Sequence, residues 1–162
     1  MGYMQDEIIF EKVDRNNFNE FFRLVEKLAE YEKQKPLDKK VKQRLKNDAI
    51  SKNPKYEAYL TKLNNKYIGY FIFFMTYSSY LALPTFYLED IFVLEEYRRK
   101  GFGYKMFHFC VHKAKEKNCA RMEWCAFNWN KPAHNFYKKI NARPLDKTYY
   151  RFTKEEIDQF LN

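Results

Sequence analysis

The chain has 162 residues and a formal net charge of +9, and 46% of its residues are hydrophobic. This length and composition predict one folded domain over residues 1–162 and exclude a disordered tail. No apolar run reaches the roughly 18 residues of a membrane-spanning helix, and residues 1–12 lack the order of a signal peptide. The three cysteines, Cys110, Cys119 and Cys125, have no metal-ligand spacing, and we expect mostly buried thiols in a reducing cytoplasm.

The first half of the chain is predicted to form a strand, two helices and a hairpin. Asp14 is a plausible N-cap for the first helix, in which apolar residues recur at helical spacing. The pair Asn64-Asn65 favours the turn of a hairpin. The expected elements are a strand at 8–13, helices at 14–31 and 38–47, and hairpin strands at 56–63 and 66–77.

The second half alternates strands and helices. Asn130 and Pro132 are typical of a helix start, and Thr153 precedes two acidic residues that suit the first turn of another helix. The expected elements are a strand at 85–94, a helix at 104–117, a strand at 120–126, a helix from Asn130 to about 140, a strand at 147–152 and a short final helix. This order predicts an α/β (mixed α+β) fold in which helices cover both faces of a mixed sheet.

A glycine-containing loop joins the 85–94 strand to the next helix. Arg98, Arg99 and Lys100 stand directly before Gly101 and Gly103. Glycines let phosphate oxygens approach backbone N–H groups, and a helix N-terminus favours an anion. The loop therefore suits a phosphate or pyrophosphate, and its alternative interpretation is an ordinary strand-to-helix turn.

The carboxylate pair Glu89-Asp90 interrupts an almost continuously apolar strand. Neighbouring side chains in a strand point to opposite faces, so one carboxylate should face each way. A carboxylate in such a strand is costly unless it is used or partnered. It can accept a proton or bind a cationic amine, and its alternative role is a structural hydrogen-bond acceptor.

The segment 128–142 is the second distinctive stretch. A helix that begins at Asn130 ends in the aromatic pair Phe136-Tyr137. The Tyr137 hydroxyl can serve as a general acid, or it can be a packed group whose hydroxyl is satisfied. His108 and His134 are interpreted as surface or filler residues rather than metal ligands.

Five segments together resemble one enzyme family, the GCN5-related N-acetyltransferases (GNAT). Within it they are most similar to the spermidine/spermine (diamine) acetyltransferase branch and its thialysine-acetylating relatives. The segments are LEDIFV at 88–93, RRKGFG at 98–103, EW at 123–124, NWNKPA at 128–133 and NFYK at 135–138. The resemblance runs from 31 to 152. It implies the GNAT fold, with a central, mostly antiparallel twisted sheet of six to seven strands between helices.

The resemblance implies acetyl-coenzyme A (acetyl-CoA) as the cosubstrate and assigns residues to it. The strand would expose backbone groups to the pantetheine arm, the loop would hold the pyrophosphate, and the later helix would lie near the thioester. The residues implied are Ile91, Phe92, Val93, Arg98, Arg99, Lys100, Gly101, Phe102, Gly103, Tyr104, Asn130, Phe136 and Tyr137.

The resemblance also implies direct acetyl transfer to an amine without a metal ion. Glu89 would assist deprotonation of the amine through a water molecule, and Tyr137 would protonate the leaving thiolate. A backbone N–H of a bulged strand near Phe92 would stabilise the oxyanion. Glu32, Glu89 and Asp90 would contact the amine substrate, and a cytoplasmic homodimer is expected.

The substrate is open at this point. The loop Ser78–Leu81 lacks the acidic residue and tryptophan of polyamine-specific enzymes, which favours a small primary amine, diamine or lysine-like molecule over spermine. Acetylation of a protein N-terminus or lysine is an alternative. A different class, a nucleic-acid-binding module, is suggested by the basic charge, but no nucleic-acid motif is present, so no nucleic-acid or membrane partner is expected.

Overall fold

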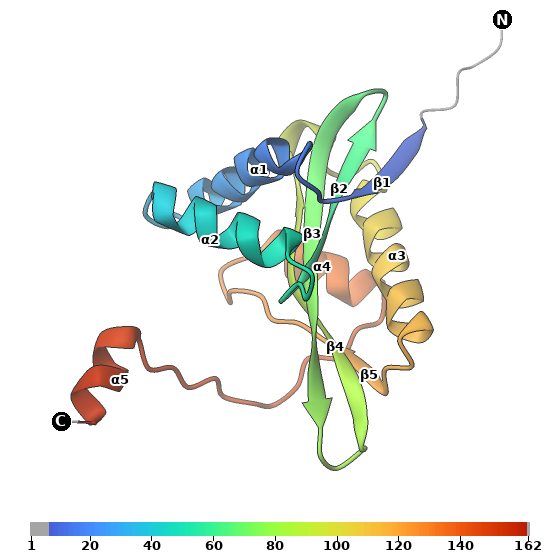
Figure 1. The fold of residues 1–162 in the computed structure, drawn as a ribbon. Coiled ribbons are helices and arrows are strands. Elements are labelled where there is room, and N and C mark those ends of the chain that lie inside the picture. The colour runs from blue at the N-terminus through green and yellow to red at the C-terminus, as the bar shows by residue number, and fades with distance from the viewer. Residues whose placement is uncertain (1–6, 162) are drawn as a thin grey trace, which may run out of the picture. The chain divides into compact units, whose positions relative to one another are not determined.

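The computed structural model describes residues 7–161 (Figure 1). It contains two compact units, the first ending at Cys125 and the second beginning at Ala126. A single domain over residues 1–162 stays a prediction. Within the described residues, no helix combines the length and apolar content that a bilayer crossing needs.

The first unit is built on a sheet with the strand order β1-β2-β3-β4-β5. Neighbouring strands are antiparallel except for β4 and β5, which are parallel, so the prediction of a mixed, mostly antiparallel sheet is confirmed. The described residues form five strands rather than six or seven. Their bounds are Ile8–Lys12, Glu57–Leu63, Lys66–Ser78, Leu83–Val93 and Arg121–Glu123.

Helices cover both faces of this sheet, as predicted. Figure 1 shows α1 (Phe18–Tyr31) and α2 (Lys39–Ile50) on one face and α3 (Phe102–Glu116) on the other. Asp38 caps α2 by accepting a hydrogen bond from the Val41 N–H at 2.7 Å. The N-cap position of α1 is Asn17 rather than the predicted Asp14.

Asp14 instead stabilises the turn that leads into α1. Its Oδ1 accepts hydrogen bonds from the N–H groups of Asn16 and Asn17, at 2.7 and 3.1 Å. Because Asp14 makes these bonds in a turn, the helix begins only at Phe18.

The core between α1 and the sheet is strongly aromatic. Phe18, Phe21 and Leu24 of α1 are fully buried against the sheet. Tyr70 of β3 meets the Phe21 ring edge to face, with 5.3 Å between ring centroids, an arrangement that adds to the stability gained by burial. This packing places Tyr31, at the end of α1, against the same core as Tyr70 of β3.

The second unit contains two short helices, α4 (Lys131–Lys139) and α5 (Lys154–Phe160). Both predicted caps are confirmed: Asn130 accepts a hydrogen bond from the Ala133 N–H, and Thr153 forms a capping box with Glu156. The predicted strand at 147–152 is wrong, because these residues have no strand pairing in the structure. Their aromatic content favours a strand, but a strand needs a partner that the described residues do not supply.

Candidate active site

Strand β4 carries one extra residue, Glu89, relative to β3. Asp90 pairs with Ile72 while Leu88 pairs with Phe73, so Glu89 has no partner of its own in β3. Such a bulge bends the strand and interrupts the alternation of side chains between faces. The simple alternation expected for Glu89 and Asp90 therefore does not hold. The bulge lies three residues before Phe92, and the family resemblance implied a bulged strand near that residue.

The Asp90 carboxylate is held by a buried tyrosine. The Tyr70 hydroxyl donates a hydrogen bond to Asp90 Oδ2 at 3.0 Å, and Tyr70 itself has no exposed surface. Burial raises the pKa of Asp90 to about 7, although the hydrogen bond from Tyr70 opposes this rise. Burial and then the charge of Asp90 raise the pKa of Tyr70 well above its ordinary value, so Tyr70 acts as a hydrogen-bond donor.

Two further carboxylates lie close to Asp90. Glu32 occupies the C-cap position of α1, and Glu89 is the exposed residue of the bulge. Burial raises the pKa of Glu32, and the negative charge of Glu89 raises it further. The charges of Glu89 and Glu32 also raise the pKa of Asp90. The structure thus brings together all three residues predicted to contact the substrate.

This arrangement is suited to a cation. Like charges at short range raise the free energy of the ionised cluster, and a positive ligand relieves that repulsion. Within residues 7–161, no ion pair links Glu32, Glu89 or Asp90 to a lysine or arginine. A protonated amine can therefore supply the missing positive charge.

The glycine loop leads directly into α3, as predicted. Gly101 has a φ of 85° at the N-cap position, a left-handed conformation that glycine adopts without strain. A side-chain carbon added at Gly101 or Gly103 would meet no atom within 4 Å. The N-terminus of α3 and the space beside it are therefore open to an anionic group.

The three cations before the loop have different surroundings. Arg98 donates a hydrogen bond from Nε to the Val93 carbonyl at 2.8 Å, and its guanidinium lies 4.7 Å from the Tyr31 ring centroid. Lys100 donates a hydrogen bond to the Glu96 carbonyl. Of these three cations, only Arg99 makes no side-chain hydrogen bond within residues 7–161. Arg99 is exposed and has a φ of 60°.

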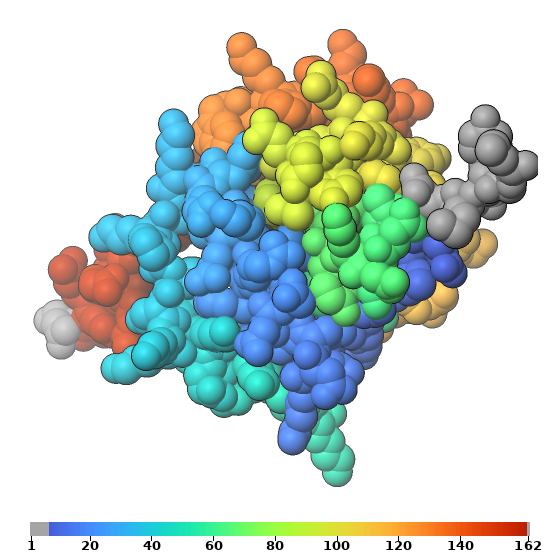
Figure 2. Space-filling model, turned by 90° about the horizontal axis from the view of Figure 1, so that it is seen from above, coloured from blue at the N-terminus to red at the C-terminus, as the bar shows by residue number. Residues whose placement is uncertain are grey.

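Arg98 therefore connects the end of α1 to the end of β4. Its guanidinium also faces the Phe92 ring, at 5.5 Å from the centroid. Figure 2 shows the 95–103 segment, in yellow, lying against α1, in blue. The predicted role of Arg98 in binding the pyrophosphate stays a prediction, whereas its contacts in the structure hold the loop in place.

Strand β4 extends beyond its pairing with β5. The last pair between them joins Tyr87 to Glu123, while β4 continues to Val93. On the side of β4 that faces β5, none of the described strands pairs with Ile91, Phe92 and Val93. On its opposite side, β3 pairs with all three residues. Their predicted contact with the pantetheine arm requires such an edge, because an unpaired strand edge offers backbone hydrogen-bonding groups.

The predicted residues of the second unit lie on or beside α4. Asn130 uses its Oδ1 to cap this helix, with 3.3 Å to the Ala133 nitrogen. The rings of Phe136 and Tyr137 contact each other edge to face, with centroids 5.5 Å apart. The catalytic role of Tyr137 and the cofactor contacts of these three residues stay predictions.

Tyr70 is a residue of the site that could not be predicted from the sequence. Tyr70 is one of several aromatic residues in β3, and nothing in its neighbours distinguishes it from a core residue. Its hydroxyl meets Asp90 only because the bulge at Glu89 sets the register of β4 against β3. That register was not visible in the sequence.

With this geometry established, comparison with known proteins identifies relatives among N-acetyltransferases. L-ornithine N5-acetyltransferase NATA1 of Arabidopsis thaliana is 40% identical over 98 residues, which cover 59% of this chain but only 43% of that protein. Thialysine N-epsilon-acetyltransferase of Sus scrofa is 27% identical over 146 residues, which cover 85% of each chain.

Solved structures agree on the fold. Aminoglycoside N-acetyltransferase AAC(6')-Iy in complex with CoA matches with a TM-score of 0.74 over 95% of this chain and 99% of that chain, at 12% identity. The acetyltransferase (GNAT) family itself matches residues 18–142. This match includes strands β2 to β5, the carboxylate cluster and the glycine loop and covers more than half of the chain, so the chain belongs to the acetyltransferase (GNAT) family.

Proposed function

We propose that this protein transfers the acetyl group of acetyl-CoA to a primary amine of a small cationic molecule. The observation that carries the proposal is the cluster of Glu32, Glu89 and Asp90 at the bulge of β4, in a chain of the acetyltransferase family. Ornithine and thialysine, the substrates in the names of its relatives, each carry a primary amine on a small molecule. The same chemistry favours a diamine, a polyamine or a lysine-like amino acid.

The residues present fit the CoA part of the cosubstrate. The glycine loop offers backbone N–H groups at the start of α3, and the space beside Gly101 and Gly103 is open. Arg99, exposed and without a hydrogen bond among the described residues, is the cation best placed to neutralise a pyrophosphate. The unpaired edge of β4 at Ile91–Val93 would bind the amide groups of the pantetheine arm.

In the proposed mechanism, the carboxylates first bind the protonated amine. Glu89 then accepts the amine proton through a water molecule, because an ammonium group has no lone pair with which to attack. The amine nitrogen bonds to the acetyl carbon as the bond from that carbon to sulfur breaks, and the nitrogen then releases its surplus proton to water, from which Tyr137 is later reprotonated. Tyr137 protonates the thiolate that leaves, and a backbone N–H of the bulged strand stabilises the oxyanion.

The proposal is tested with a panel of amines. Release of CoA is expected with at least one of putrescine, spermidine, ornithine, thialysine and lysine, and more slowly with a histone-type peptide. Thiol-specific colorimetry measures the release. The proposal fails if no amine gives turnover above the rate of acetyl-CoA hydrolysis and calorimetry detects no binding of acetyl-CoA. Turnover with the peptide alone would instead favour a protein acetyltransferase.

The contribution of Gly101 to cofactor binding can be separated from its effect on the backbone. Gly101→Val is expected to raise KM for acetyl-CoA at least tenfold, because the new side chain fills the space beside the loop. It should also cost about 1–2 kcal/mol of stability, since the residue has a left-handed conformation. Asn118→Val is the matched control, because Asn118 has a φ of 52° at the other end of α3. It should be destabilised similarly with an unchanged KM.

Tyr137→Phe tests the general acid. Removal of the hydroxyl is expected to lower kcat about 100-fold, with KM for acetyl-CoA changed less than threefold. Tyr150→Phe removes an exposed hydroxyl from the same unit and should leave both constants unchanged. Steady-state kinetics with the best amine of the panel provide the measurement. If Tyr137→Phe retains its turnover, the proton donor is another group.

A homodimer is also part of the proposal. The segment 145–161 exposes many large apolar side chains, and a second copy of the chain is the partner proposed to cover them. They are Leu145, Tyr149, Tyr150, Phe152, Ile157, Phe160 and Leu161. Exposed apolar groups gathered in one segment are typical of protein–protein contacts. Sedimentation velocity distinguishes a dimer from a monomer.

A further inference from the structure

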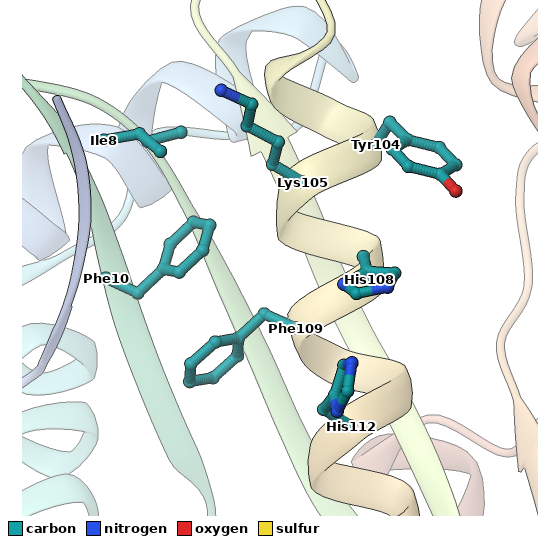
Figure 3. Close-up of a pocket in the computed structure, with 7 residues that line it drawn as sticks. All are labelled: Ile8, Phe10, Tyr104, Lys105, His108, Phe109 and His112. Atoms are coloured by element: carbon teal, nitrogen blue, oxygen red, sulfur yellow. The ribbon is translucent and has the colours of Figure 1, made fainter. Parts of the chain in front are cut away.

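Two histidines lie one turn apart on the solvent-exposed side of α3. Figure 3 shows His108 and His112 on the same face of the helix, and their ring centroids are 4.6 Å apart. Both residues are exposed. Within residues 7–161, the ring nitrogens of these two residues make no hydrogen bond, so their lone pairs remain available.

Their spacing is the one that metal-binding helices use. Residues four apart lie on one face of a helix, and two such histidines are sufficient to chelate a single ion. Neutral imidazole is a good ligand for Zn²⁺, Cu²⁺ and Ni²⁺. We propose that His108 and His112 form a two-histidine chelating site for a borderline divalent metal ion of this group.

The surroundings leave room for the rest of the coordination shell. The histidines border an open cavity of about 360 Å³, whose other lining residues are Ile8, Phe10, Tyr104, Lys105 and Phe109. Figure 3 shows Phe109 pointing away from the two imidazoles. Water or a small ligand can therefore occupy the remaining metal positions.

Charges near the site partly cancel. Glu116 lies one helical turn beyond His112, close enough to interact with it electrostatically, and is paired with Lys113 at 2.7 Å. Among residues 7–161, no group of three or more His, Cys, Asp or Glu side chains is arranged to hold a metal ion. The site therefore has two protein ligands, and we expect its metal ion to exchange readily. The metal ion has no part in the proposed acetyl transfer.

The site is tested by titrating the untagged protein with Ni²⁺ and Zn²⁺ in calorimetry at pH 7.5. One ion per chain is expected, together with a rise in Tm, because the ion binds the folded helix and not the unfolded chain. At pH 5.5 the binding should be lost, since protons compete with the metal ion for the imidazole nitrogens. Absence of binding at pH 7.5 would overturn the proposal.

Five variants distinguish a chelate from scattered surface ligands. His108→Ala and His112→Ala should each weaken binding at least tenfold, because one imidazole alone binds the ion only weakly, and the double variant should abolish binding at this site. His134→Ala is the matched control, since His134 is in the other unit and contacts the Phe127 carbonyl. Cys125→Ser controls for the exposed thiol. If each α3 variant loses less than threefold, or if a control loses tenfold, the chelate is refuted.

Discussion

Glu89→Gln is expected to lower kcat by a factor of about 100 to 1000, because glutamine cannot accept the proton of the amine. KM for acetyl-CoA should change less than threefold, since Glu89 lies outside the glycine loop. Stability should not fall, because Glu89 is exposed and its charge repels Asp90 and Glu32. Initial rates over a range of pH, with thermal melting of the same samples, provide the measurement.

Glu96→Gln is the matched control for this substitution. It removes the same charge from an exposed position seven residues along the chain. Its kinetic constants should match those of the unchanged protein within a factor of two. Retention of more than a third of the turnover by Glu89→Gln would remove Glu89 as the proton acceptor. Asp90 would then be the next candidate, because it lies beside Glu89 and has a raised pKa.

The sequence predicted features that depend on local interactions. Asp38, Asn130 and Thr153 were identified as helix starts, and each accepts a hydrogen bond from the backbone of its own helix. The glycine loop was likewise expected directly before a helix, and α3 begins at Phe102, two residues before the predicted position 104. These features need information from only a few neighbouring residues.

Features that depend on strand pairing were not predictable in the same way. The bulge at Glu89 exists only in the register of β4 against β3, and that register brings Asp90 to Tyr70. The 147–152 segment has the aromatic composition of a strand but no strand partner among the described residues. The sequence therefore identified the three carboxylates, and only the structure showed that they interact and which tyrosine supports them.

Arg98 illustrates why a motif does not define the role of every residue in it. The family resemblance assigned Arg98, Arg99 and Lys100 together to the pyrophosphate. In the structure Arg98 contacts the Val93 carbonyl and two aromatic rings, whereas Arg99 is exposed. We therefore expect Arg98 to support the loop and Arg99 to supply the positive charge that faces the pyrophosphate.

The second large effect is expected from Asp90→Asn, as a gain of stability that depends on pH. The pKa of Asp90 is about 7 in the folded protein, against 3.8 for an unperturbed aspartate. Between these pH values the folded state binds a proton that the unfolded state does not. The stability of the unchanged protein should therefore fall as pH rises from about 4 to about 7 and then stay low. Asparagine cannot ionise, so the Asp90→Asn variant should not lose stability over this pH range.

The gain should be small at pH 4.5 and largest above pH 8, where its upper limit is about 4 kcal/mol for a pKa shift of roughly three units. Urea unfolding at pH 4.5 and 8.5 measures it. Asparagine preserves the contact with Tyr70, since its amide oxygen can accept the same hydrogen bond. Asp48→Asn is the control, because Asp48 is paired with Lys55 at 3.0 Å on the surface and should give no gain. An equal gain at both pH values would contradict the burial of a charged Asp90.

The same substitution separates the stability of the site from its function. Loss of the Asp90 charge should weaken binding of a cationic amine, so KM for the amine is expected to rise about tenfold while the protein becomes more stable at pH 8.5. Opposite changes in stability and affinity are expected where like charges are held together for a ligand of opposite charge. If Asp90 were only a structural acceptor for Tyr70, Asp90→Asn would leave KM unchanged. Kinetics and unfolding of this one variant therefore decide between the two roles of Asp90.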